Sequence, residues 1–225
     1  MRSTLAFTRR CFLLKSAALA ASAALPASVG AYPAAEDRSV PAPAAEGPHM
    51  IGPLAEYSPQ VGTLVSMLNW MHESLLRATQ RLTTADLDYL HDAQANSIGA
   101  LMLHLVATEV VYQDMTFFNQ KGFSAANEKT WGVAMKLGAE ARQQIKGNNL
   151  EYYRARLQQV RATTLAELKK RDDQWLMLVD PSFFNNQPTN NYCKWFHVAE
   201  HIGNHRGQIT WLAKRLPGAA ADGAD

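Results

Sequence analysis

The sequence is poor in cysteine. Its 225 residues include only Cys11 and Cys193, and Cys11 precedes the apolar N-terminal run, where a lipid-attachment cysteine would follow it. A chain that loses this N-terminal segment keeps one thiol, which excludes an intramolecular disulfide even in an oxidising compartment. No Cys-x-x-Cys pair is present, so a zinc ribbon is excluded as well. The stability of the fold must therefore come from packing.

Several motifs of common enzyme classes are also missing. The chain has no glycine-rich phosphate loop and no Gly-x-Ser-x-Gly nucleophile turn. The predicted helices contain no Glu-x-x-His pair, which argues against a di-iron carboxylate bundle. His72 precedes Glu73, but the second histidine of a metalloprotease helix is absent.

The chain has no excess of basic over acidic residues when residues 1–31 are left out of the count. The full chain has 22 Lys+Arg and 20 Asp+Glu, and residues 1–31 hold four of the basic residues and no acidic one. The remainder has 18 basic against 20 acidic residues, a net charge of −2. Such a chain lacks the electrostatic footprint of a nucleic-acid binder, so nucleic acid is not expected as a partner.

The N-terminus is typical of an export signal. The segment 8–15 contains the pair Arg9-Arg10, and an Ala-rich run follows over 16–25. That run is too short for the roughly 20 residues of a membrane span, and small residues follow up to Ala31. The sequence predicts a twin-arginine signal peptide over residues 1–31 and a periplasmic or secreted protein. No membrane span is expected after cleavage.

The remaining residues are enough for one domain with a sizeable core. Segment 32–55 is rich in alanine and proline and is predicted to be a flexible linker. The domain is predicted over 56–217, and residues 218–225 are predicted to be a disordered tail.

Four long stretches carry apolar residues at helical spacing. Ser58-Pro59 is typical of a helix start, and Pro181 and Pro217 follow the ends of the last two stretches. Because strand-like alternation is absent, the sequence predicts an all-α, up-down four-helix bundle. The predicted helices run from Ser58 to about Leu82, from Asn96 or Ser97 to about Phe118, from Asn149 to about Leu178, and from about Asn190 to Leu216.

A long excursion separates the second and third predicted helices. It covers residues 121–148, much more than the 2–8 residues usual between bundle helices, and it contains Trp131. A short helix is predicted over about 127–146. The excursion is equally compatible with a binding loop and with a plain crossover.

Four of the seven histidines point to a metal site. His197, His201 and His205 share one stripe of the fourth predicted helix, because residues four apart lie on the same face. Two such imidazoles can share a divalent cation, and His104 in the second helix would supply a third ligand. His197 and His205 are about 12 Å apart along the axis, so only one adjacent pair can join His104. Spacing alone does not decide between 197/201 and 201/205.

The other candidate residues have ordinary structural interpretations. His49 lies in the predicted linker, and His72 and His91 are interpreted as surface or boundary residues without a metal partner. Cys193 is interpreted as a buried apolar residue, although it would approach a metal bound by the 197/201 pair.

No carboxylate is an obvious general base. Glu109 is five residues beyond His104, about 140° around the helix, and is expected to face elsewhere. Glu200 points off the histidine stripe, toward a neighbouring helix.

Two segments together resemble the DinB-like superfamily. They are Ser97-Ile-Gly-Ala-Leu-Met-Leu-His104-Leu and, far downstream, His201-x-x-x-His205-Arg-Gly-Gln. The resemblance extends from about Tyr57 to Leu216 and implies a four-helix bundle in which three histidines hold a divalent metal. Carried over to this chain, the ligands are His104, His201 and His205, with His197 beside them. Some members of the superfamily are thiol-dependent S-transferases or isomerases, and many have no assigned reaction.

The expected cofactor is therefore one divalent metal ion, zinc first, with nickel, iron or manganese as alternatives. Three histidines leave a coordination position open, which is typical of catalytic metal. We expect Lewis-acid activation of water or a thiol, in a hydrolase or an S-transferase. The alternatives are a non-catalytic periplasmic metal- or ligand-binding bundle and a helical interaction protein with incidental histidines. The expected partners are an unidentified small-molecule substrate and the twin-arginine export machinery, and a homodimer is left open.

Overall fold

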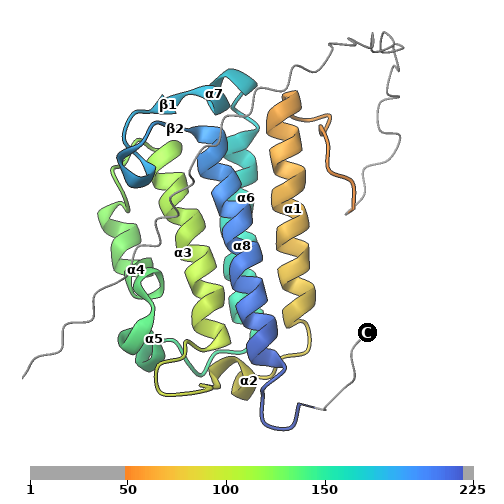
Figure 1. Ribbon diagram of the computed structural model, residues 1–225, viewed down its shortest axis with the longest axis vertical. Coiled ribbons are helices and arrows are strands. Elements are labelled where there is room, and N and C mark those ends of the chain that lie inside the picture. Colours follow the sequence, from red (N-terminus) through yellow and green to blue (C-terminus); the bar gives the residue numbers. More distant parts are fainter. Residues whose placement is uncertain (1–48, 220–225) are drawn as a thin grey trace, which may run out of the picture. The chain divides into compact units, whose positions relative to one another are not determined.

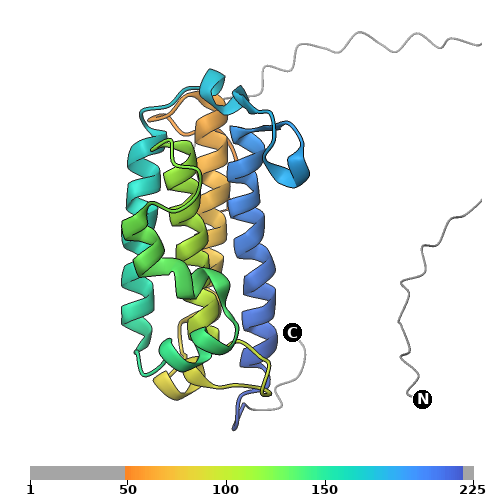
Figure 2. The same ribbon diagram turned by 90° about the vertical axis from the view of Figure 1, so that its left-hand side faces the viewer.

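The computed structural model describes residues 49–219. The predicted signal peptide lies outside these residues, as do positions 32–48 of the predicted linker and 220–225 of the predicted tail. Within them, long helices run side by side as a bundle, as Figures 1 and 2 show, and the predicted all-α fold is confirmed. These helices are α1 (Pro59–Thr79), α3 (Ile98–Thr116), α6 (Leu150–Leu168) and α8 (Asn191–Ala213).

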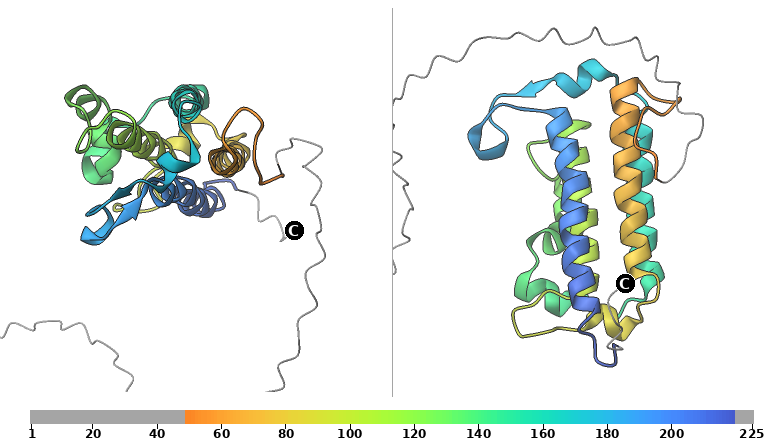
Figure 3. Two further views of the ribbon diagram at one scale, coloured as in Figure 1. Left: turned by 90° about the horizontal axis from the view of Figure 1, so that it is seen from above. Right: turned by 45° about the vertical axis from the view of Figure 1, so that its right-hand side comes forward.

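Shorter elements connect the long helices. The helices α4 and α5 lie on the outside of α3, and a two-stranded antiparallel hairpin lies at the end of the bundle where α8 begins (Figure 3). In the hairpin, Val179 pairs with Asn190 and Asp180 with Thr189. The short elements are α2 (Thr84–Asp88), α4 (Ala125–Lys136), α5 (Gly138–Gln144), α7 (Asp173–Met177), β1 (Val179–Asp180), the 3₁₀ turn η1 (Phe184–Asn186) and β2 (Thr189–Asn190).

Polar side chains cap the N-termini of three of the long helices. Ser97, Asn149 and Asn190 each accept a hydrogen bond from a backbone N–H in the first turn of α3, α6 and α8. Ser58 does not act in this way, although the sequence places it at the cap of α1. Asp173 of α7 caps α1 instead, because its Oδ1 accepts from the Ser58 hydroxyl at 2.7 Å and from two backbone N–H groups of α1.

The third predicted helix is too long. It was expected to reach about Leu178, but α6 ends at Leu168 and α7 begins at Asp173. The Asp172 side chain accepts from the N–H of Trp175 at 2.8 Å, which starts a new helix. The carboxylate of Asp173 is then free to cap α1.

The excursion holds two helices, whereas one was predicted over 127–146. The helices α4 and α5 are separated at Leu137 (φ 54°) and Gly138 (φ 74°), two successive residues with left-handed backbone. This backbone stops α4. The N–H of Gly138 donates to Oδ1 of Asn96 at 3.1 Å and does not continue the helix.

The last residues of the predicted linker lie along α1. The N–H of Gly52 donates to the Ser66 hydroxyl at 3.1 Å, and the ring of His49 lies edge-on to Trp70. Gly62 allows this approach, because a Cβ there would lie 2.5 Å from the backbone nitrogen of Leu54.

Helix α3 is the most enclosed element of the bundle. It packs against α4, α6 and α8, and nearly every residue from Ile98 to Val110 is buried. Polar groups on this helix therefore need partners from its neighbours. Between residues 49 and 219, no helix is both long and apolar enough to cross a membrane.

A buried ion pair joins α3 to α6. Nη2 of Arg161 lies 3.0 Å from Oε2 of Glu109, and both side chains are almost fully buried. Thr164 donates to the same carboxylate and accepts from Nε2 of Gln113 at 2.8 Å. Glu109 thus faces away from the histidines, as predicted, and is fully engaged by α6.

His72 on α1 was predicted to be a surface or boundary residue, and this prediction is wrong. Only 8% of His72 is exposed. Burial, followed by the positive charge of Arg161, lowers the pKa of His72 to about 4. Nε and Nη1 of Arg161 have no hydrogen-bond partner within the described part of the chain, so Glu109 neutralises that charge from one side only.

The depressed pKa of His72 predicts a pH-dependent stability. The unfolded chain takes up a proton near pH 6.5, whereas the folded chain resists it until about pH 4. The contribution of His72 is thus complete above about pH 6.5 and is lost as the pH falls toward 4, by about 2 kcal/mol between pH 7 and pH 5. His72→Leu should reduce the pH dependence of the unfolding free energy by that amount, measured by urea denaturation. The exposed control His91→Leu should leave it unchanged, and equal slopes for both variants would contradict the assignment.

Candidate metal centre

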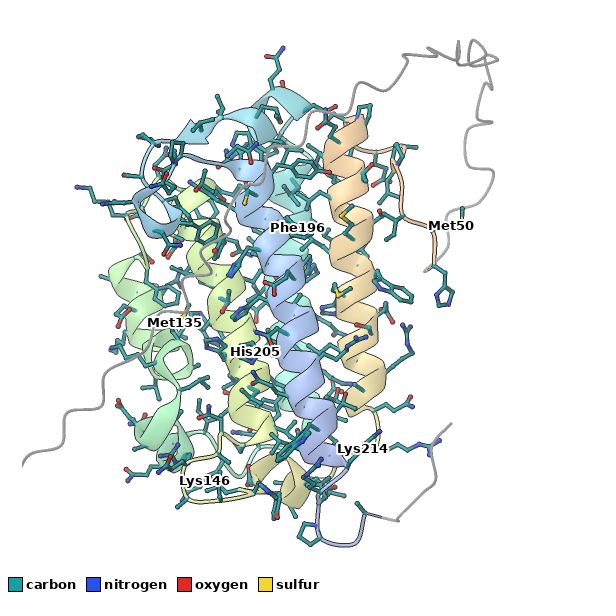
Figure 4. All side chains as sticks on the ribbon, viewed as in Figure 1. Met50, Met135, Lys146, Phe196, His205 and Lys214 are labelled. Atoms are coloured by element: carbon teal, nitrogen blue, oxygen red, sulfur yellow. The ribbon has the colours of Figure 1, made fainter. Side chains whose placement is uncertain are left out.

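Helices α3 and α8 bring three histidines together. Nε2 of His104 lies 3.0 Å from Nε2 of His201. The ring of His205 completes the group, with centroids 4.8 Å from His104 and 4.4 Å from His201. One ring nitrogen of each residue lies within 4.8 Å of the others. Figure 4 shows His205 at the junction of α3 and α8, about midway along the bundle.

Hydrogen bonds fix two of the three imidazoles. Nδ1 of His104 lies 3.1 Å from the carbonyl oxygen of Ala134, and Nδ1 of His205 lies 3.0 Å from Oε1 of Gln208. A carbonyl oxygen only accepts, so Nδ1 of each ring carries the hydrogen and Nε2 carries a lone pair. Partners of this kind orient histidines that bind metal.

The carbonyl of Ala134 is free because α4 ends there. In a continuing helix it would accept from the N–H of residue 138. Gly138 turns away and donates to Asn96 instead. The segment 121–148 therefore connects two helices of the bundle and also orients His104 through its main chain.

The close contact between His104 and His201 fits a cation site. With the hydrogen of His104 on Nδ1, two Nε2 atoms at 3.0 Å need a proton on His201 or a cation between them. For comparison, two nitrogens bound to one tetrahedral zinc ion are about 3.4 Å apart. The three histidines thus fit a divalent ion after small side-chain rotations.

The three imidazoles are held neutral, as metal binding requires. Burial, followed by the charges of His205 and His104, lowers the pKa of His201 to about 3. Burial also lowers the pKa of His104, followed by the charge of His205. The pKa of His205 is lowered by burial as well, although the hydrogen bond to Gln208 and the charge of Glu200 oppose this effect.

His197 lies outside the group. Its Nδ1 lies 2.9 Å from the hydroxyl of Tyr112, and its ring centroid is 5.3 Å from that of His201. Burial raises the pKa of Tyr112, which keeps the hydroxyl protonated. Spacing left two histidine pairs open, and the structure assembles the pair 201/205 with His104.

Cys193 does not take part and is exposed, which corrects its interpretation as a buried apolar residue. It lies in the first turn of α8, where its N–H donates to the capping side chain of Asn190 and its side chain faces outward. The apolar character of a thiol did not reveal which face of the helix it occupies. Glu200 is also exposed.

Sequence reasoning missed three groups around the histidines. Gln208 stands three residues after His205, so helical spacing could have indicated it. Tyr112 lies two turns after His104, which is a weaker signal of the same kind. The carbonyl of Ala134 carries no signal in the sequence, because every residue has such a group.

Comparisons with known proteins agree with this architecture. The model of the DinB family matches residues 57–224. A crystal structure of a conserved protein from Enterococcus faecalis superposes with a TM-score of 0.53 at 15% sequence identity, and it covers 67% of this chain and 93% of that one. At this identity the likeness shows the fold alone. No curated protein matches the chain.

The geometry predicts that His205 matters more than His197 for metal binding. His205→Ala removes one of three nitrogens and should sharply lower zinc occupancy after dialysis, measured by elemental analysis. His197→Ala should weaken zinc binding by at most about 10–100-fold, the range for residues that only orient a ligand. His91→Ala serves as the exposed control. Full occupancy in His205→Ala together with loss in His197→Ala would favour the other pair.

Proposed function

Because this chain belongs to the DinB family, we propose that His104, His201 and His205 hold one divalent cation and that the protein is a metal-dependent enzyme. Zinc is the first candidate, with nickel, iron and manganese as alternatives. The observation that carries the proposal is the pair of Nδ1–H hydrogen bonds, to Ala134 and Gln208, which leave two Nε2 lone pairs beside His201.

The residues around the histidines favour a reaction of the hydrolase or S-transferase type. A bound divalent ion would supply Lewis-acid activation of water or a thiol. The protein contributes orientation through Ala134 and Gln208 and keeps the imidazoles neutral by burial. In the described part of the chain no carboxylate joins the three histidines, since Glu109 is paired with Arg161. This arrangement suits a reaction that needs no strong protein base.

The export signal bears on the choice between water and a thiol. We propose that residues 1–31 direct the chain through the twin-arginine machinery to the periplasm or beyond. Low-molecular-weight thiols are mainly cytosolic. Hydrolysis, or another reaction without a thiol, is therefore favoured over S-transfer for the exported protein.

The proposed site predicts a stoichiometric metal and metal-dependent turnover. Protein purified without chelator should hold about one divalent ion per chain by elemental analysis. A screen of ester, amide and thiol-transfer substrates should give an activity that a chelator removes and that the added ion restores. His201→Ala should lack both the ion and the activity. Metal without turnover would indicate a non-catalytic metal-binding bundle, and failure to take up zinc, nickel, iron or manganese would contradict the site itself.

The export assignment has its own test. Replacing both Arg9 and Arg10 by lysine should leave unprocessed precursor in the cytoplasm, because the twin-arginine pair is the feature the machinery reads. Arg2→Lys is the matched control, since Arg2 lies outside the pair. Cell fractionation with detection of precursor and mature protein measures the outcome. Normal accumulation of the double variant outside the cytoplasm would contradict the assignment.

A further inference from the structure

A groove lies beside the three histidines, one helical turn away along both α3 and α8. Its volume is about 490 Å³, and its lining includes Leu101 and Gln208. Leu101 precedes His104 by three residues and Gln208 follows His205 by three, so each lies about one turn from a histidine. On α8 the lining runs from Asn204 to Leu212. It therefore begins beside His205, which Figure 4 labels.

Three amide side chains line this groove, and two of them, Asn96 and Gln208, use their oxygens within the protein and leave their donor ends free. Oδ1 of Asn96 accepts from the N–H of Gly138 at 3.1 Å, and Oε1 of Gln208 accepts from Nδ1 of His205 at 3.0 Å. An amide side chain has one accepting oxygen and two donating N–H groups. Both oxygens are thus used by the protein, and no acceptor among residues 49–219 pairs with either NH₂ group.

Apart from the exposed amide of Asn204, the rest of the lining carries no polar side chain, and none of it is acidic. Leu101, Leu212 and Trp211 form its apolar part, and Trp211 is 45% exposed. Positive charge lies close to it, since the guanidinium of Arg215 stacks on Trp211 at 3.8 Å and Arg142 donates to the carbonyl of Gln94, next to the groove. A ligand that suits these walls is apolar and carries hydrogen-bond acceptors.

We propose that the groove binds a small apolar or aromatic molecule whose carbonyl or carboxylate oxygen accepts hydrogen bonds from Asn96 and Gln208. The volume is in the range of small-molecule sites. This inference rests on the proposed function in one respect: the bound molecule is the substrate of the neighbouring metal site. Its binding is nevertheless measurable without the metal.

Three probes of similar size test the ligand chemistry on the chelated protein. They are 3-phenylpropionate, its methyl ester and propylbenzene, measured by isothermal titration calorimetry. The two oxygen-bearing probes should bind at least tenfold more tightly than propylbenzene, because only they accept from the amides. Tighter binding of the carboxylate than of the ester identifies a charged acceptor, and equal binding identifies a carbonyl. Equal binding of all three, or of none, would overturn the inference.

Two conservative variants test the residues. Asn96→Asp and Gln208→Glu keep the oxygen that accepts from Gly138 or His205 but remove the NH₂ group. Each should weaken binding of 3-phenylpropionate at least tenfold. The uncharged ester should also lose affinity, which separates the missing donors from charge repulsion. Gln158→Glu makes the same change on the exposed face of α6 and should bind both probes normally.

Metal titration of the same samples separates this inference from the proposed function. If zinc binds but the oxygen-bearing probes do not, the groove assignment alone fails. If the probes bind with the predicted selectivity but zinc does not, the proposed metal site fails and the groove stands. Unchanged probe binding in both Asn96→Asp and Gln208→Glu would overturn the roles of the two amides.

Discussion

The hydrogen bond from His104 to the carbonyl of Ala134 is the contact on which the site depends. It determines which nitrogen of His104 carries the hydrogen, and it turns the other nitrogen toward α8. A side chain could swing away, but a carbonyl at the end of α4 is fixed by the backbone around it. The packing of α4 on α3 is therefore part of the site, although α4 provides none of the three histidines.

Polar contacts with neighbouring helices occur along much of α3. This helix is enclosed by α4, α6 and α8, and its polar side chains are paired with different neighbours. His104 meets α4 and α8, Glu109 meets Arg161 of α6, and Tyr112 meets His197 of α8. Sliding or rotating α3 would leave buried polar groups without partners, which is strongly unfavourable. The polar pairs thus fix the position of a helix whose apolar surface alone would allow several.

Much of this arrangement was predictable from the sequence, and the errors have physical causes. Caps and prolines placed both ends of α1, α3 and α8 and the start of α6 within a few residues. The histidine pattern with the family resemblance identified the group that the structure assembles. The apolar pattern of α6 continued past Asp172, so the break there was missed. His72 was misplaced because its interior neighbour Arg161 belongs to another helix, and pairing between distant segments is not visible in local spacing. The role of Ala134 is carried by its main chain, which no side-chain pattern records.

The break at Leu137 and Gly138 has a wider consequence. It frees the Ala134 carbonyl for His104, and the N–H of Gly138 occupies the oxygen of Asn96, so that the Asn96 NH₂ is left for the groove. Gln208 makes a second connection, because one amide faces both His205 and the groove. Two binding events that share such groups are thermodynamically linked, and the factor by which one changes the affinity of the other is the same in both directions. If the proposed cation and the proposed groove ligand both bind, a single irregularity in the backbone makes them mutual effectors.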